Sequence, residues 1–173
     1  LGRDDVGTMV LVPRILESVS IPVLASGGIG DGRGLAAALA MGADGIEMGT
    51  RFIATAECSA HPNYKQALVA ARETDTLIIE RSLGTPGRVL AGPAAERILA
   101  LEQAGARDEL IRAISGAENR RAAIDGDMEG GWVWAGQVAG LIHDIPSVQD
   151  LLDRIVGDAA RRLRAAAAAC AAN

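Results

Sequence analysis

The chain has 173 residues, a net charge of −5, 49% apolar residues and a mean hydropathy of +0.20. This length is enough for a real hydrophobic core, because a chain of about 150 residues buries roughly 68–70% of its unfolded surface. The acidic balance and the scarcity of aromatic residues argue against a nucleic-acid partner, which needs clustered Lys and Arg and usually stacking rings. No apolar run approaches the roughly 18 residues of a membrane span, no secretory signal pattern opens the sequence, and two cysteines in no metal spacing predict neither disulfides nor zinc. We expect a cytoplasmic protein without a membrane partner.

The first fifty residues predict an alternation of helices and short strands. Apolar positions repeat at helical spacing over 8–19, with Pro13 as a distortion or a mark of the first turn. Residues 21–25 are a short apolar run typical of a strand buried on both faces. An Ala-rich helix over 33–41 and a second strand over 45–48 complete the unit. This order predicts a right-handed parallel unit and an α/β fold.

The alternation stops after residue 56. We predict that residues 57–127 form an inserted, mostly helical small α(+β) domain. Its helices are expected over 61–72 and on both sides of Gly105, with a β-prone run at 76–80. A glycine pair then leads into a helix expected from about Val133 to Ile142.

A long helix is the clearest signal of the C-terminal region. Ser147 fits an N-cap, and Asp150 three residues later makes a carboxylate variant of the capping box. Apolar residues then repeat at helical spacing as far as Leu163. The predicted organisation is residues 1–56 for the last βα units and a phosphate site, 57–127 for the insertion, 128–164 for closing helices, and 165–173 for a frayed tail.

Two glycine turns follow the two predicted strands. Gly27-Gly28 come after the first strand, and Gly49-Thr50 come after the second. Backbone N–H groups, a hydroxyl and helix N-termini can hold a phosphate dianion without a cationic side chain. Tight βα turns would explain one glycine pair, but two such turns separated by a single helix favour phosphate. In (β/α)₈ TIM barrels, phosphate binds in the loops after strands seven and eight, and a full barrel takes roughly 250 residues. We therefore expect the C-terminal part of such a barrel.

Several motifs then become specific when they are read together. They are Ile21–Ile29, Asp31–Gly34, Met48–Phe52, Asp75-Thr76, Arg88, Gly126-Asp127, Ala135–Gln137 and Gly140–Pro146. These motifs resemble the FMN-binding end of the nitronate monooxygenase family, over nearly the whole chain except its tail. The FMN-dependent enoyl-acyl-carrier-protein reductases are close relatives that share most of the pattern, and residues 61–65 resemble them equally well.

The resemblance implies a flavin cofactor, FMN, and a set of residues that bind it. Its phosphate would rest on the two glycine turns, with backbone contacts from the end of the second strand. The implied set is Gly2, Ser26, Gly27, Gly28, Glu47, Met48, Gly49, Thr50 and Gln137. The family's catalytic histidine lies in a Gly-Gly-His segment that would immediately precede Leu1, so we predict no catalytic residue within this chain and no metal ligand.

The activity implied by the resemblance is oxidation of an alkyl nitronate by FMN and oxygen. The alternative is hydride transfer from a nicotinamide through FMN to an enoyl thioester. In both reactions FMN supplies the reactivity, while the protein supplies placement and a proton acceptor.

Other reactive residues are expected to have structural roles. His61 and His143 follow no strand, so neither is expected to be the catalytic base. Lys65 lies in a predicted helix, which argues against a Schiff base. For Arg88, we favour capping of a surface turn over neutralisation of an anionic substrate. Trp134 is expected in packing or in a substrate channel.

The small residues between 135 and 140 leave two interpretations open. They allow either close helix packing or close approach to the flavin, with Gln137 adding a hydrogen bond. Two further alternatives also stay open: a phosphate-binding barrel without flavin, and a truncated, non-catalytic binding domain. A half barrel has unpaired strand edges, so by itself it should aggregate or need a partner, and we expect no turnover from it. A homodimer also remains open.

Overall fold

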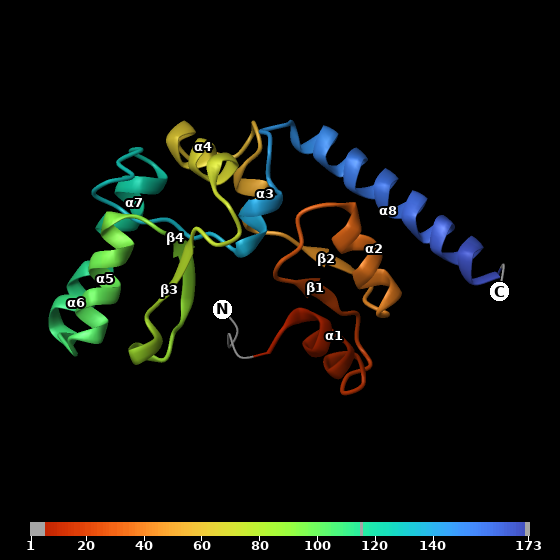
Figure 1. The fold of residues 1–173 in the computed structure, drawn as a ribbon, viewed down its shortest axis with the longest axis horizontal. Coiled ribbons are helices and arrows are strands. Elements are labelled where there is room, and N and C mark those ends of the chain that lie inside the picture. The colour runs from red at the N-terminus through yellow and green to blue at the C-terminus, as the bar shows by residue number, and fades with distance from the viewer. Residues whose placement is uncertain (1–5, 115, 172–173) are drawn as a thin grey trace.

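The computed structural model describes residues 6–114 and 116–171. Its fold is α/β and contains two small sheets, one parallel and one antiparallel (Figure 1). The helices and strands are α1 (Thr8–Leu16), β1 (Leu24–Ser26), α2 (Gly32–Ala40), β2 (Gly45–Glu47), α3 (Thr50–Ile53), α4 (Pro62–Ala70), β3 (Thr76–Ile79), η1 (Arg81–Leu83), β4 (Gly87–Leu90), α5 (Pro93–Gln103), α6 (Arg107–Ile114), α7 (Ala117–Ala123), η2 (Gln137–Leu141) and α8 (Val148–Ala171).

The parallel sheet forms where the sequence predicts it. β1 pairs with β2 in register from Leu24 opposite Gly45 to Ser26 opposite Glu47, and α2 connects the two strands. The α2 helix begins after Asp31, whose carboxylate accepts hydrogen bonds from the amides of Arg33 and Gly34. Because the strands are parallel and in register, both end at the same edge of the sheet.

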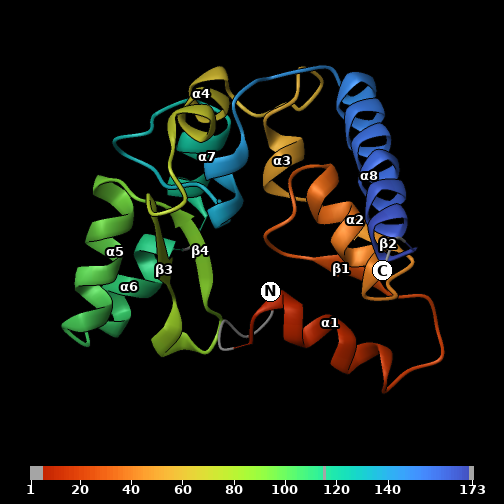
Figure 2. The same ribbon diagram turned by 45° about the vertical axis from the view of Figure 1, so that its right-hand side comes forward.

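Helices α1, α2 and α8 enclose the core around this sheet. Ala25 of β1 and Ala38 of α2 are fully buried there, together with Val12 of α1 and Ile155 of α8. Helix α8 lies alongside α2 in both views (Figure 2). A Cβ atom on Gly32 would lie only 2.7 Å from the carbonyl oxygen of Ile155. Glycine at the start of α2 therefore lets the two helices approach closely.

In the second sheet, the two strands are joined by a third segment, which is linked to β4 by an isolated β-bridge between Val89 and Trp134. β3 pairs with β4 antiparallel, and residues 132–135 run along the other edge of β4. The amide of Leu90 donates to the carbonyl of Val133 at 3.0 Å, and the amide of Ala135 donates to the carbonyl of Arg88 at 3.0 Å. Residues of α5 and α6 share a buried cluster with one face of this sheet, and residues of α4 and η2 share another with the opposite face. The sheet thus lies between two helical layers.

The helix expected from Val133 to Ile142 is wrong. Residues 132–135 are extended against β4, and only Gln137–Leu141 form a short 3₁₀ helix, η2. Trp132, Val133 and Trp134 are aromatic or β-branched residues that suit a strand, and the exposed hydrogen-bonding edge of β4 selects that conformation.

The frayed tail expected from residue 165 is also wrong for the residues that the structure describes. Helix α8 continues without interruption to Ala171. Alanine has the highest intrinsic helix propensity, so an Ala-rich run extends an established helix even where its side chains are exposed. At its other end, α8 begins as predicted, because Ser147 Oγ accepts from the amide of Asp150 at 3.1 Å.

Candidate functional site

The two glycine turns lie side by side at one edge of the parallel sheet. Gly27 and Gly28 follow β1 with φ of +97° and +74°, a region that side chains rarely tolerate. Met48 and Gly49 follow β2 and lead directly into α3, which starts at Thr50. The in-register pairing of Ser26 with Glu47 brings the two turns to the same edge.

Backbone donors in these turns are available for a ligand. Among the described residues, none accepts a hydrogen bond from the amides of Gly28, Gly49 or Thr50. A Cβ atom built on Gly28 or Gly49 would meet nothing within 4 Å. Amides without partners beside open space form a cradle that fits a phosphate group and that a side chain would fill.

Hydrogen bonds from two distant segments support the turns. The hydroxyl of Thr8, the first residue of α1, donates to the carbonyl of Gly27 at 3.1 Å. The hydroxyl oxygen of Thr50 accepts from the amide of Gly136 at 3.0 Å. The second bond joins the turn after β2 to Gly136, the residue that precedes η2 and lies 86 residues away in the sequence.

These turns line a cavity of about 330 Å³, a size at the lower end of small-molecule sites. Seven of the residues expected to bind the cofactor meet there: Ser26, Gly27, Gly28, Glu47, Met48, Gly49 and Thr50. Gln137 is not among the lining residues and its side chain is exposed. Gly2 lies outside the described residues. Seven residues outside the predicted cofactor-binding set also line the cavity: Ile29, Ile53, Arg88, Trp134, Ala135, Gly136 and Val138.

The small residues near 136 have divided roles. Ala135 and Gly136 line the cavity. Gly140 instead packs against the backbone, because an added Cβ would lie 2.6 Å from the amide nitrogen of Glu73. Ala139 is fully buried in the core beside α4. Close approach to the cavity and close packing therefore both occur, at different residues of one segment.

Arg88 lines the cavity and does not cap a surface turn, so the expectation for this residue is corrected. It lies in β4 opposite Ile78, and its Nη1 donates to the hydroxyl of Thr76 at 3.0 Å. Its position could not be read from the sequence, because it depends on how the antiparallel sheet packs against the parallel one.

Trp134 is held in the cavity wall by the chain's tyrosine. The hydroxyl of Tyr64 in α4 donates to the carbonyl of Trp134. Tyr64 is buried, and this burial, with a smaller contribution from the nearby Cys58 thiol, raises the pKa of its hydroxyl well above the usual value. The tyrosine therefore stays neutral and keeps its donor at physiological pH.

Neither histidine lines the cavity. His61 is the N-cap of α4, where its Nδ1 accepts from the amide of Asn63 at 3.1 Å. His143 lines a different cavity, of about 340 Å³, between the start of α2 and α8. Lys65 is buried, and its Nζ donates to the carbonyls of Thr55 at 2.7 Å and Ala56 at 3.2 Å, which gives this side chain a structural role.

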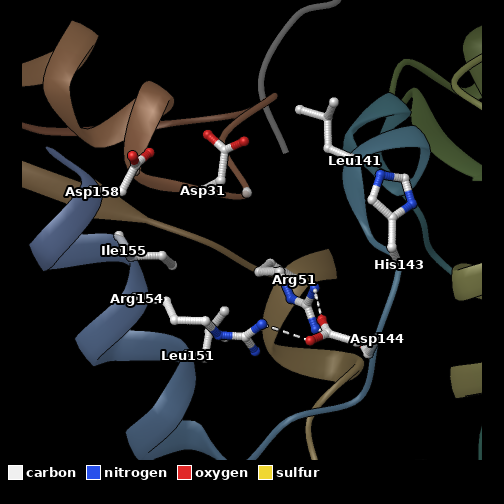
Figure 3. Close-up of a pocket in the computed structure, with 11 residues that line it drawn as sticks. Asp31, Arg51, Leu141, His143, Asp144, Leu151, Arg154, Ile155 and Asp158 are labelled. Atoms are coloured by element: carbon white, nitrogen blue, oxygen red, sulfur yellow. Dashed lines mark hydrogen bonds and ion pairs between the residues drawn. The ribbon is translucent and has the colours of Figure 1, made fainter. Parts of the chain in front are cut away.

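An ionic network lies behind the second turn. Figure 3 shows Arg51 of α3 and Arg154 of α8 converging on Asp144. Arg51 is only 3% exposed, and burial lowers its pKa although the charge of Asp144 opposes that shift. Burial raises the pKa of Asp144. The hydrogen bond and charge of Arg154, followed by those of Arg51, together lower it by more, so the pKa of Asp144 is below its usual value. The carboxylate is thus ionised and fixes α3 against α8.

Among the described residues, neither the pattern of a metal site nor that of a membrane-spanning helix is present. The described residues contain no group of three or more His, Cys, Asp or Glu side chains that could hold a metal ion. In the same part of the chain, no helix combines the length and the apolar character that crossing a membrane requires.

Comparison with known proteins gives consistent matches. The sequence profile of the family described as nitronate monooxygenase matches residues 2–158. A probable nitronate monooxygenase of Staphylococcus saprophyticus is 32% identical over 154 residues, which cover 89% of this chain and 43% of the relative. A (3aS,4S,5R,7aS)-5-hydroxy-7a-methyl-1-oxo-octahydro-1H-indene-4-carboxyl-CoA dehydrogenase of Rhodococcus jostii is 33% identical over an alignment that covers 92% of this chain and 56% of the relative.

Solved structures give the same result. FabK from Thermotoga maritima matches with a TM-score of 0.87 and 40% identity, over 95% of this chain and 52% of that chain. A nitroalkane oxidase from Streptomyces ansochromogenes matches with a TM-score of 0.74 and 30% identity, over 93% of this chain and 45% of that chain. The chain spans about half the length of the relatives that it matches. With an α/β fold and a profile match over 2–158, this chain belongs to the nitronate monooxygenase family, close to the FMN-dependent enoyl-acyl-carrier-protein reductases.

Proposed function

We propose that this chain is the FMN-binding, C-terminal part of a (β/α)₈ TIM-barrel oxidoreductase. In this proposal β1 and β2 are the seventh and eighth barrel strands, and residues 57–127 are an insertion that covers the cofactor. The observation that carries the proposal is the pair of adjacent glycine turns, whose amides at Gly28, Gly49 and Thr50 have no acceptor among the described residues. Phosphate at this position is typical of barrel enzymes.

The residues present fit an FMN phosphate. Amides from two turns can each donate to a phosphate oxygen, and the lack of side chains at positions 28 and 49 lets the phosphate approach the backbone. When bound, FMN would supply the redox chemistry by accepting electrons from the substrate. The chain's own residues would bind and orient it, while apolar side chains such as Met48 and Val138 would exclude water from the cavity.

The activity that we propose for the whole protein is oxidation of an alkyl nitronate with oxygen. Support comes from the family match and from the similarity to a nitroalkane oxidase. Neither His61 nor His143 lies in the cavity, so we propose that the proton acceptor is the family's histidine ahead of Leu1. We propose an alkyl nitronate as the protein's own substrate and the cytoplasm as its location.

A reductase acting on an enoyl thioester is the second candidate. The observation that favours it is the higher identity and TM-score with FabK, 40% and 0.87, than with the nitroalkane oxidase, 30% and 0.74. It would use the same flavin site with a nicotinamide as the electron source.

Anaerobic reduction of the purified protein separates the two candidates. The full-length protein should be yellow, and an alkyl nitronate alone should bleach the flavin in the absence of oxygen. Rapid bleaching by NADH or NADPH, with none by the nitronate, would select the reductase. A colourless protein that takes up no added FMN would contradict both activities and leave a phosphate-binding barrel without flavin.

A further inference from the structure

Arg88 is the cation of the cavity. Of the described residues that line it, Arg88 alone carries a positive charge, and it comes from the antiparallel sheet, while the glycine turns come from the parallel sheet. Its neighbours in the wall include Trp134 and Ala135, which run along the edge of the same strand. The cavity therefore has backbone donors on one structural unit and a guanidinium on the other.

One hydrogen bond anchors the guanidinium of Arg88, and other N–H donors of the group stay without an acceptor among the described residues. Its Nη1 donates to Thr76, whose side chain is largely buried and so limits where the arginine can turn. An arginine has five N–H donors. No acceptor among the described residues engages Nε or Nη2 of Arg88, and neither atom is buried. This leaves donors in the fork geometry that binds the two oxygens of a planar anion.

The carboxylate in the cavity does not neutralise Arg88. Glu47 at the end of β2 accepts a hydrogen bond from the hydroxyl of Ser26, and no ion pair joins it to Arg88 within the described residues. The proposed phosphate position needs no cation either, because the amides of Gly28, Gly49 and Thr50 are available to donate hydrogen bonds to it. The positive charge of Arg88 is therefore available for a second anion.

We infer that Arg88 is a specificity-determining residue that binds the planar, two-oxygen anionic group of the substrate, such as a nitronate or a carboxylate. The inference rests on the proposed function, because it places this group in the flavin cavity. It also explains why an arginine stands on the face of β4 that is turned toward the glycine turns.

Binding of isobutyrate tests the assignment, because its planar carboxylate matches the two-oxygen anionic group of propyl-2-nitronate and it cannot turn over. Titration calorimetry of the FMN-loaded full-length protein should show isobutyrate binding, with much weaker binding of the neutral isobutyramide. The Arg88→Gln variant should bind isobutyrate at least about tenfold more weakly, as expected for the loss of a charged hydrogen bond. Arg88→Lys should lose less, since it keeps the charge.

The matched control is Arg14→Gln, which removes an arginine paired only with Glu17 on the exposed surface of α1. This control should bind isobutyrate and FMN as the wild type does. FMN affinity of Arg88→Gln should stay within about twofold of the wild type, a readout that a structural defect would change. Thermal melting should confirm that both variants fold.

Three results would overturn the assignment: wild-type isobutyrate affinity in Arg88→Gln, no isobutyrate binding by the wild type, or a large loss of FMN affinity that shows Arg88 to hold the phosphate. Failure of the wild type to take up FMN would instead contradict the proposed function. The isobutyrate titration of the protein as purified would then decide the role of Arg88 separately.

Discussion

Gly49 and Gly92 occupy equivalent local positions but differ in their surroundings. Each is the N-cap of a helix, α3 and α5 respectively, and a Cβ on either would meet no atom within 4 Å. Neither has a φ in the left-handed region, so alanine fits both backbones. Only Gly49 lines the cavity at the glycine turns.

Gly49→Ala should therefore weaken FMN binding at least about tenfold without lowering the melting temperature, because the new methyl group occupies the space that the phosphate needs. Fluorescence titration with FMN measures this effect. Gly92→Ala is the matched control and should bind FMN normally. Equal FMN affinity in the two variants would show that the phosphate does not rest on this turn.

Tyr64 provides a pH-dependent signal, since it is the chain's one tyrosine. Burial raises its pKa in the folded state above the ordinary value, which is about 10. Its contribution to stability is thus fully present below about pH 10 and is lost as the pH rises above that value. In an ultraviolet titration, the tyrosinate signal of the folded protein should appear only well above pH 10. The same titration in denaturant should show the ordinary pKa, and a folded-state midpoint near 10 would contradict the burial of this hydroxyl.

At the scale of elements, the contact between α2 and α8 depends on Gly32. A Cβ there would lie 2.6 Å from the Cβ of Asp158 and 2.7 Å from the carbonyl oxygen of Ile155. Gly32→Ala should lower the free energy of unfolding by about 1–3 kcal/mol, because backbone atoms of α8 cannot yield easily. Chemical denaturation measures this change.

Gly157→Ala on α8 is the control for this contact. Its Cβ would meet no atom within 4 Å, and alanine inside a helix should raise stability by about 0.5–1 kcal/mol. If Gly32→Ala were as stable as the wild type, the two helices would not pack as closely as the structure indicates.

Elements specified by local sequence were predicted well. The start of α8 follows from Ser147 and Asp150, and α5 and α6 lie on either side of Gly105 as expected. The sequence predicts a helix from about Val133 to Ile142, but residues 132–135 are extended, because their conformation depends on β4, more than forty residues earlier in the sequence. Small residues near 136 fit both patterns, so only the tertiary partner decides between them.

In the molecule as a whole, the sequence predicts the part of the cavity formed by consecutive residues of the parallel sheet. It does not predict the part that the antiparallel sheet contributes. The turns after β1 and β2 carry their glycines in the sequence, and seven of the residues named there line one cavity. Arg88 and Trp134 reach the same cavity from the antiparallel sheet, and no local signal reports how that sheet packs. Their roles required the structure. The division into domains at residues 57 and 127 remains a prediction.

In the proposed site, main-chain amides at the ends of two neighbouring strands hold the phosphate of FMN. Riboflavin lacks this phosphate and is otherwise the same ligand, so comparing the two affinities in the wild-type protein isolates its contribution. We predict that FMN binds at least about 100-fold more tightly than riboflavin, the gain expected from two or more charge-assisted hydrogen bonds. Equal affinity for FMN and riboflavin would contradict this role of the amides.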